Sequence, residues 1–340
     1  MSASSSAAFN PAAGPRFCCA GGLGELPADM LGAIVYGREA RAECVQAGDP
    51  RLAAVPLEAM PGAPRVETWI TQGPVTSGTM QDIHYTSSAK HLFGFLEVDE
   101  AAAGGLRAAT RGAYRQMLRF HSRRAHSCIW RIWNFIDAIN EGEGDAERYR
   151  QFCLGRAEGM ADHVDVYPAG TAVGTRTGQR RLQVVWLAGR GPGRPIENPR
   201  QVSAYRYPRQ YGPASPSFSR AMHLEGQLLI SGTSSIVGHE TVHGDDISAQ
   251  LRESVSNLRL VAGAAAMDPD LLTGLKAYVR HGADLGRVAA ELSGGCFAGK
   301  GVCVLSADIC RSELLIELEA VVQCPPAPAV SEPSRYAGGT

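Results

Sequence analysis

Residues 239–243 have the types and spacing of a zinc site. They read HETVH, and in the H-E-x-x-H motif of zinc proteases one helix presents both histidines to the metal while the glutamate acts as general base. That motif needs a continuous helix, whereas Gly238 and Gly244 bracket these residues and a β-branched stretch leads into them. We therefore expect a turn with no metal, followed by a helix with Asp246 as its N-cap.

Other signatures of chemistry are missing from the sequence. It has no G-x-S-x-G and no G-x-G-x-x-G that opens a helix after a strand, and residues 294–301, GGCFAGKG, lack the Ser or Thr of a P-loop. The 9 cysteines are scattered without a C-x-x-C pair, which indicates neither a disulfide framework nor a cysteine-based zinc site. These patterns argue against nucleotide, dinucleotide and hydrolase-elbow chemistry.

Composition and charge limit the kinds of partner that this protein can bind. Lys+Arg 33 against Asp+Glu 34 give a net charge of -1, which predicts neither a nucleic-acid-binding nor a membrane-surface protein. No apolar run approaches the roughly 20 residues that span a bilayer, and the N-terminus lacks the basic start and apolar stretch of a secretory signal. We expect a cytoplasmic protein of 340 residues, whose 44% hydrophobic content supplies a large core.

The elements that must position a site follow from hydrophobic periodicity. Leu106, Ala109, Ala113, Met117 and Phe120 recur at spacings of three and four, which predicts an amphipathic helix. The next stretch, SCIWRIWNFIDAIN, is dense in aromatic and β-branched residues and predicts a buried strand with its tryptophans in the core.

A second set of elements repeats this plan later in the chain. Residues 227–238 predict a strand, a glycine turn and a short strand. Residues 247–261 carry an apolar stripe at helical spacing, and further helices are expected around 271–279 and 283–292. The last expected elements are two strands, at 301–307 and 314–322.

Strands covered by helices on one side predict an α+β fold of the split βαβ kind rather than a doubly wound sheet. The length suits two domains, and the proline-rich segment PGRPIENPR indicates a boundary between them. The expected divisions are a disordered leader at 1–20, an N-terminal domain at 21–198, a C-terminal domain at 199–324 and a disordered tail at 325–340.

Three segments resemble the RidA family of reactive-intermediate deaminases. Residues 226–264 contain ISG, DDISAQ and NL in the family's order, residues 211–221 look like its opening segment, and residues 314–322 look like its closing strand. The resemblance implies two RidA-like domains with the chorismate-mutase-like split βαβ topology, each a mixed sheet with helices packed on one face. RidA deaminases hold the substrate carboxylate with an arginine about fifteen residues before the final glutamate, a place that falls here near Val302, and the nearest cation is Lys300.

A narrower family, the chorismatases, resembles the chain from about Gly21 to Val322. The resemblance is carried by IWRIWNFIDAIN, ERYRQFCLGRAEGM, SAYRYPRQYGPASPSFSRA, ISGTSSIVGHET and ADICRSELLIELEAV. Chorismatases are RidA-like proteins enlarged by an N-terminal half, which accounts for the long segment before the RidA-like part. The resemblance implies an enzyme that cleaves the enolpyruvyl ether of chorismate to pyruvate and a hydroxybenzoate.

The same resemblance implies the catalytic residues. Chorismatases carry a catalytic glutamate in the last motif, where Glu317 stands, and members that release 3-hydroxybenzoate carry a cysteine seven residues earlier, where Cys310 stands. Glu317 would protonate the terminal methylene of the enolpyruvyl group, which needs a buried carboxyl that keeps its proton, although alternation alone would put it on the exposed face of an edge strand. Cys310 would assist loss of the ring hydroxyl, with 3-hydroxybenzoate as the expected product, 4-hydroxybenzoate as a second one, and no metal or organic cofactor.

Chorismate is a dianion, so its site should supply fixed cations and donors. We predict Arg209 as the first carboxylate partner, because guanidinium binds carboxylate through a two-point fork; its alternative role is structural, in a proline-rich loop. The phenols predicted around it are Tyr205, Tyr207 and Tyr211. The amides of Gly232 and Thr233, in a glycine turn, are predicted to hold the second carboxylate, with Ser231 and Ser234 as weaker candidates.

Other functions stay open at this level. Some chorismatases hydrolyse chorismate only to a dihydroxycyclohexadiene carboxylate and pyruvate. The ring product therefore distinguishes this type from the type that forms an aromatic hydroxybenzoate. A RidA-like imine deaminase is one alternative, although this chain lacks the arginine with which RidA deaminases hold the substrate carboxylate. Another is a ligand-binding module, which would bind a small carboxylate without turnover. RidA proteins are trimers with sites between subunits, whereas a fused pair of similar domains could satisfy those contacts internally, so a monomer and a trimer are both compatible with the sequence.

Overall fold

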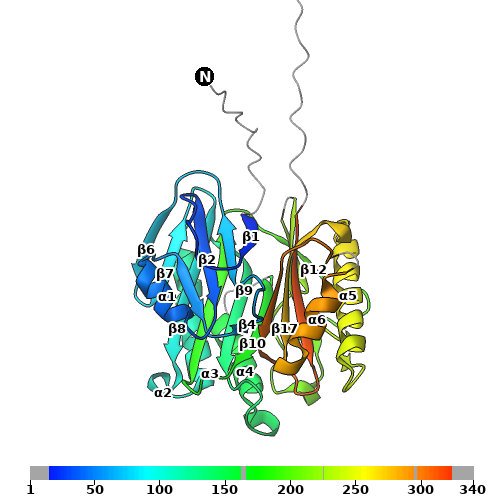
Figure 1. Cartoon of the computed structure of the whole chain (residues 1–340). Coiled ribbons are helices and arrows are strands. Elements are labelled where there is room, and N and C mark those ends of the chain that lie inside the picture. Colours follow the sequence, from blue (N-terminus) through cyan, green and yellow to red (C-terminus); the bar gives the residue numbers. More distant parts are fainter. Residues whose placement is uncertain (1–14, 162–165, 225, 295–296, 324–340) are drawn as a thin grey trace, which may run out of the picture.

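Two seven-stranded mixed sheets form the centre of the molecule and face each other, with helices on their outer sides (Figure 1). Trp133 and Leu187 from one sheet and Tyr278 and Val321 from the other meet in a shared buried layer. The expected α+β fold, with mixed sheets and helices packed on one face, is confirmed. The structure is a computed structural model that describes residues 15–161, 166–224, 226–294 and 297–323.

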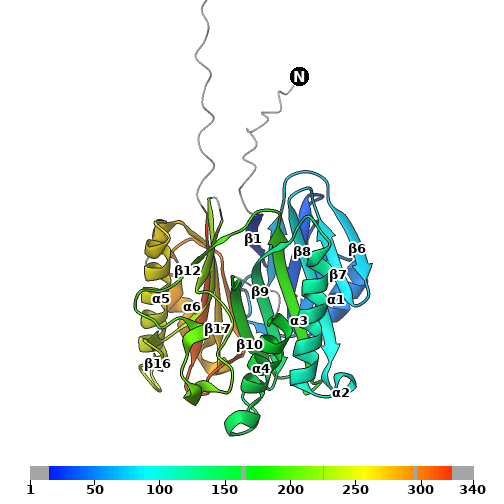
Figure 2. The same ribbon diagram turned by 180° about the vertical axis from the view of Figure 1, so that it is seen from behind.

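The N-terminal sheet has the strand order β19-β10-β9-β11-β8-β7-β6. β9 and β10 are parallel, and the other neighbours are antiparallel. Helices α3 and α4 cover its outer face (Figure 2), where Met117 and Phe120 are buried against Ile132 and Trp186. Its elements are β6 (Thr76–Met80), β7 (Ile83–Ser87), β8 (His91–Asp99), α2 (Glu100–Ala103), α3 (Leu106–Ser122), β9 (Cys128–Asp137), α4 (Arg148–Met160), β10 (Ala169–Thr175), β11 (Arg181–Gly189) and β19 (Asp308–Ile309).

The C-terminal sheet has the strand order β12-β13-β14-β20-β17-β18-β4. Only β17 and β18 are parallel neighbours. Helices α5 and α6 cover the outer face, where Leu251 and Leu258 pack against Leu228 and Leu318. Its elements are β4 (Glu58–Ala59), β12 (Arg194–Ile196), β13 (Ala221–Leu224), β14 (Gln227–Ser234), α5 (Ile247–Ala264), β17 (Leu272–Val279), α6 (Leu285–Leu292), β18 (Val302–Ser306) and β20 (Ile316–Gln323).

The two sheets follow one plan. The order β10-β9-β11-β8-β7-β6 repeats in β18-β17-β20-β14-β13-β12, with the parallel pair in the same place. The seventh strand is exchanged: β4, early in the chain, pairs with β18, and β19, late in the chain, pairs with β10. Each half of the chain therefore completes the sheet of the other.

A third, four-stranded sheet with the order β1-β5-β2-β3 packs against the layer between the large sheets. Its elements are β1 (Arg16–Ala20), β2 (Met30–Tyr36), α1 (Ala40–Ala47), β3 (Leu52–Val55) and β5 (Val66–Ile70). β1 lies inside the segment that we predicted as a disordered leader, so that prediction is wrong for residues 16–20. Phe17 explains the order, because its ring is buried against Gly274 of β17, where a Cβ would come within 2.2 Å of it. Residues 1–14 and the predicted tail lie outside the described residues.

The prediction of a helix around 271–279 is also wrong, because this segment is strand β17. β17 lies between β20 and β18 with both of its faces buried. Its apolar residues Leu272, Leu275 and Val279 happen to fall at spacings of three and four. A strand buried on both faces has no strict alternation, so periodicity could not distinguish it from a buried helix.

The glycine turn expected within 227–238 is wrong: Gly232 and Thr233 belong to strand β14, which has only an irregularity between Ile230 and Thr233. The remaining expected elements are confirmed. α3 and β9 follow one another as predicted, α6 covers most of the third predicted helix, and α5 begins after Asp246, whose side chain accepts a hydrogen bond from the Ala249 amide at 3.0 Å. Across the described part of the chain, the helices are too short or too polar to cross a membrane.

Candidate active site

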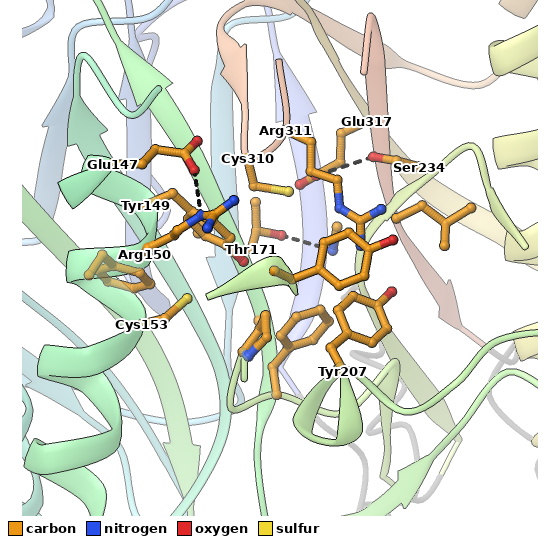
Figure 3. A pocket seen from close by; sticks show the side chains of 18 of the residues that line it. Glu147, Tyr149, Arg150, Cys153, Thr171, Tyr207, Ser234, Cys310, Arg311 and Glu317 are labelled. Atoms are coloured by element: carbon orange, nitrogen blue, oxygen red, sulfur yellow. Dashed lines mark hydrogen bonds and ion pairs between the residues drawn. The ribbon is translucent and has the colours of Figure 1, made fainter. Parts of the chain in front are cut away.

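A cavity of about 360 Å³ opens between the two halves of the chain, within the range of roughly 300–1,000 Å³ typical of small-molecule sites. Helix α4 and strand β10 form one wall, and β14, the segment before β13 and the segment that leads into β20 form the other. Figure 3 shows Tyr149 and Cys153 on the first side, Ser234 and Glu317 on the second, and Cys310 between them.

Glu317 is the buried carboxyl of this cavity. It lies on β20, a central strand, and only 5% of it is exposed. Ser234, its partner on β14, donates to Glu317 Oε2 at 3.3 Å. A Cβ at position 232 would lie 2.0 Å from Glu317 Oε1, so only glycine lets the carboxyl approach β14 this closely. Alternation alone had placed Glu317 on an edge strand, but β14 and β17 flank it.

The pKa of Glu317 is raised from 4.5 to about 8. Burial is the main cause, because it disfavours the charged form, and the negative charge of Glu319 adds to it; the Ser234 hydroxyl and the Arg131 and Arg220 charges act weakly in the opposite direction. Glu317 is therefore mostly protonated at neutral pH.

Glu319 lies two residues along the same face of β20 but, unlike Glu317, is surrounded by cations. Its carboxylate pairs with Lys276 and with Arg131, the latter at 2.7 Å, and accepts a hydrogen bond from Thr171 at 2.6 Å. Burial by itself would raise its pKa, but the Lys276 and Arg131 charges outweigh burial and hold the pKa of Glu319 well below its usual value. Thr171 also accepts from the Gly232 amide at 3.0 Å, which connects this ionised group to the cavity wall.

Three arginines with unpaired nitrogens line the cavity. Arg156 and Arg220 are each only 3% exposed. In the described part of the chain, Arg156 Nε and Nη2, Arg220 Nε and Arg311 Nη2 are buried without a hydrogen-bond partner. A buried guanidinium N–H without a partner is costly, so this arrangement suits a ligand with several anionic oxygens.

Other contacts fix these guanidinium groups in place. Arg220 donates to the Tyr207 hydroxyl at 2.7 Å and to the Val202 carbonyl at 3.1 Å. Arg311 donates to the His239 carbonyl at 2.9 Å and stacks 3.9 Å from the centre of the Tyr211 ring. Arg220 and Arg311 thus each keep a nitrogen without a partner while neighbours hold their orientation.

Helix α4 brings Tyr149, Cys153 and Arg156 to the cavity, because spacings of four and three put them on one helix face. α4 can lie close to α3 because it has glycines at the contact: a Cβ at Gly155 would lie 2.3 Å from the Arg107 carbonyl, and one at Gly159 would lie 2.7 Å from Tyr114. Arg156 faces β10 beside Gly170.

The cavity thiols are neutral. Burial raises the pKa of Cys310 to about 12, with a further contribution from Glu317, and burial likewise raises the pKa of Cys153 to about 12. Cys310 can therefore act as a weak hydrogen-bond donor, but not as a thiolate nucleophile.

Among the predicted site residues, the structure brings six into the cavity wall: Glu317, Cys310, Tyr207, Tyr211, Gly232 and Ser234. Two others lie behind the wall. The Ser231 hydroxyl donates to the Ser219 carbonyl at 2.6 Å and accepts from the Gly170 amide at 2.9 Å. Thr233 donates to the Ser231 carbonyl at 2.8 Å. Both hydroxyls are used to hold β14 in place.

Arg209 and Tyr205 do not line the cavity, so their prediction as ligand contacts is not supported by the structure. Arg209 begins the short turn η3 (Arg209–Tyr211), in which Gln210 and Tyr211 face the cavity and Arg209 faces solvent. Its guanidinium pairs with Asp145 at 2.5 Å, and 66% of the side chain is exposed. Tyr205 instead packs against Tyr167, with 5.4 Å between the ring centres.

Sequence reasoning missed the three cavity arginines. A signal was available, since Arg156, Arg220 and Arg311 all lie inside segments that resemble chorismatases. Of the tyrosines predicted around Arg209, Tyr207 and Tyr211 do reach the site, while Arg209 and Tyr205 turn away.

The HETVH segment is not helical. Glu240 and Thr241 form strand β16, paired with β15 (Ile236–Val237), and His243 has a left-handed backbone with φ 60°. His239 Nδ1 lies 3.2 Å from the Tyr211 hydroxyl, whereas His243 Nε2 faces Glu253 at 3.5 Å. Among the described residues, no three His, Cys, Asp or Glu side chains are grouped to hold a metal ion.

Comparison with known proteins identifies the family of the chain. The profile of the family described as "Chorismatase FkbO/Hyg5-like, N-terminal" matches residues 67–188. A 3-hydroxybenzoate synthase from Streptomyces hygroscopicus is 34% identical over 316 residues, covering 86% of this chain and 92% of that protein. A chorismatase from Streptomyces rapamycinicus is 36% identical over 279 residues, covering 75% and 81%. A chorismatase crystal structure superposes with a TM-score of 0.77 at 28% identity, covering 93% of this chain and 100% of that one. This chain belongs to the chorismatase family.

Proposed function

We propose that this chain cleaves the enolpyruvyl ether of chorismate, releasing pyruvate and a hydroxybenzoate, chiefly 3-hydroxybenzoate. Relatives named chorismatase and 3-hydroxybenzoate synthase support the reaction. The observation that supports this reaction is that a protonated, buried Glu317 shares a cavity with several guanidinium groups that have unpaired nitrogens.

The arginines are proposed to bind the two carboxylates of the substrate. Arg156 comes from the α4 wall, whereas Arg220 and Arg311 come from the opposite wall, so a dianion can be held at both ends. Guanidinium groups form two-point contacts with carboxylates. Tyr207 and Tyr211 supply flat apolar surface beside Arg220 and Arg311.

Glu317 is proposed to protonate the terminal methylene carbon of the enolpyruvyl group. A carbon of an enol ether is a weak base, so the acid must be both protonated at neutral pH and fixed in position. Burial meets the first need, and β20 with Ser234 meets the second. If water captures the resulting oxocarbenium ion, the hemiketal collapses by breaking the bond between the ether oxygen and the side-chain carbon, and the water oxygen becomes the ketone oxygen of pyruvate. If the ring hydroxyl captures it instead, that oxygen becomes the ketone oxygen and its bond to the ring breaks as well, so release of pyruvate and loss of the ring hydroxyl oxygen occur together.

The ring becomes aromatic when it loses one ring hydrogen together with a hydroxyl. If water captures the cation, this loss returns the water, so chorismate yields pyruvate and hydroxybenzoate without a net co-reactant. We assign Cys310 to this step, because its neutral thiol lies in the cavity wall near Glu317. Without that step, the ring product would be the dihydroxycyclohexadiene carboxylate, which is the second candidate.

The test is incubation of the parent protein, Glu317→Gln and Cys310→Ala with chorismate, following pyruvate release and separating the ring products by chromatography. We expect 3-hydroxybenzoate from the parent, a loss of at least about 100-fold in rate for Glu317→Gln, and a smaller aromatic share for Cys310→Ala. A parent protein that binds chorismate but releases no pyruvate would be a ligand-binding protein, and our proposal would be wrong.

The carboxylate sites are tested with a matched pair of arginines. Arg156→Gln should raise KM by at least about tenfold, because one charge-assisted hydrogen bond contributes about 1.5–3 kcal/mol. Arg209→Gln removes the same charge outside the cavity and should leave KM within about twofold. Equal effects of both variants would contradict the assignment of Arg156.

A further inference from the structure

The segment between β19 and β20 carries four cavity residues, among them Cys310 and Arg311, but has no strand partner of its own. Backbone carbonyls in such a segment need partners, because a buried unpaired carbonyl is costly. Its shape therefore has to come from side chains outside it.

Arg280 supplies most of these partners. It follows β17, and only 10% of its side chain is exposed. Its Nε donates to the Leu314 carbonyl at 2.7 Å, and its Nη2 donates to the carbonyls of Ile309 and Arg311 at 2.9 and 2.8 Å. The Arg280 amide donates to the Leu315 carbonyl at 2.9 Å. Three side-chain bonds thus reach carbonyls on both sides of Cys310.

The remaining nitrogen of Arg280 ties this segment to the N-terminal half. Nη1 donates to Asn140 Oδ1 at 3.0 Å and to Asp308 Oδ1 at 3.1 Å. Asn140 in turn donates to the Ile309 carbonyl at 3.0 Å. A guanidinium has a rigid planar fork of five N–H donors, so one side chain fixes the segment against both sheets.

We propose that Arg280 is the positioning residue that holds Cys310 and Arg311 at the cavity and thereby sets the share of aromatic product. Arg280 does not itself line the cavity, so it acts through the segment that it holds. The effect on product share rests on the proposed cleavage of chorismate, whereas the placement of Cys310 can be measured without turnover.

The placement is tested by alkylating the folded protein with iodoacetamide and following Cys310 by mass spectrometry. In Arg280→Gln, we expect Cys310 to react at least about fivefold faster than in the parent, while Cys153, on α4, keeps its rate as an internal reference. The same Cys310 rate in both proteins would overturn the proposal, whatever the protein does with chorismate. If Arg280→Gln does not fold, Arg280→Lys and Asn140→Ala keep most of the structure and should show the same change to a smaller extent.

The functional consequence is tested with chorismate. Arg280→Gln should lower the 3-hydroxybenzoate share of total ring product at least about twofold and raise KM, because Arg311 moves with the segment. Arg176→Gln is the matched control: Arg176 pairs with Asp308 and donates to the Arg280 carbonyl at 2.7 Å, but does not touch Cys310 or Arg311. It should keep the product ratio of the parent.

A lower melting temperature of Arg280→Gln with unchanged product share and KM would show that Arg280 is only structural. A parent that forms no pyruvate would refute the proposed function but not the alkylation result.

Discussion

Glu317 and Glu319 show how two identical side chains on one strand acquire opposite protonation states. Both are buried and lie on the same face of β20. Glu319 has Lys276, Arg131 and Thr171 as partners, whereas among the residues that the structure describes Glu317 has only the Ser234 hydroxyl as a hydrogen-bond partner. Burial and the negative charge of Glu319 together raise the pKa of Glu317. Glu319 is therefore a fixed anion, whereas Glu317 is a neutral acid.

The protonated form of Glu317 predicts how activity depends on pH. Because the acid must carry its proton and its pKa is about 8, kcat/KM for pyruvate release should be constant below that pH and fall tenfold for each unit above it. The pH profile of pyruvate release measures this. A profile that instead rises with pH through this range would mean that the carboxylate, and not the acid, is the active form.

Lys276 is expected to be a large contributor to stability. It is 2% exposed and pairs with both Glu67 and Glu319, each of which is also buried. Lys276→Met would leave two buried carboxylates short of a cation, so the free energy of unfolding should fall by about 3–5 kcal/mol, measured by urea denaturation. Arg41→Gln, which breaks the exposed pair with Glu97, should cost less than about 1 kcal/mol. Similar losses in the two variants would contradict this view.

At the scale of elements, the site depends on how closely neighbouring strands and helices approach. β14 and β20 can hold Glu317 between them because position 232 has no side chain, and α4 reaches the cavity because glycines let it pack against α3. Backbone proximity, rather than any single polar contact, determines where the acid lies.

Gly232→Ala adds a single methyl group but should therefore strongly lower activity. The added Cβ would meet Glu317 Oε1 at 2.0 Å, so the carboxyl must move, and we expect kcat for pyruvate release to fall at least about tenfold. Gly112→Ala is the control, since Gly112 lies in α3 with open space around its Cβ position. It should raise the free energy of unfolding by about 0.5–1 kcal/mol and leave kcat unchanged. Full activity in Gly232→Ala would argue that Glu317 is not fixed as described.

At the scale of the molecule, the two halves repeat one plan but are not independent. They exchange the edge strands β4 and β19, share the buried layer between the sheets, and each contribute one wall of the cavity. The acid comes from one half, whereas Arg156 and Thr171 come from the other. Both halves of one chain therefore contribute to the proposed site.

Specific activity should consequently not depend on protein concentration. We expect the same kcat per chain from nanomolar to micromolar protein, whether size-exclusion chromatography finds a monomer or a trimer. A kcat that falls on dilution in step with dissociation would show that a second copy contributes to the site.

The sequence determined the elements with clear periodicity or caps, such as α3, β9 and the N-cap at Asp246, because those signals are local. Through the family resemblance it also identified Glu317 and Cys310, since each lies in a motif of fixed spacing. It misassigned β17, whose two buried faces erase the alternation that distinguishes a strand, and it missed β1, which is ordered by contacts of Phe17 far along the chain.

Only the tertiary structure decided which cations face the acid. Arg209 and Arg220 lie in the same motif, yet one turn sends the first to solvent while the second is buried beside Tyr207. The raised pKa of Glu317 was likewise decided by tertiary structure, because burial between two sheets and the charge of Glu319 cause it. A local pattern reports which residues alternate or repeat, but burial, pairing and close approach arise from residues distant in sequence.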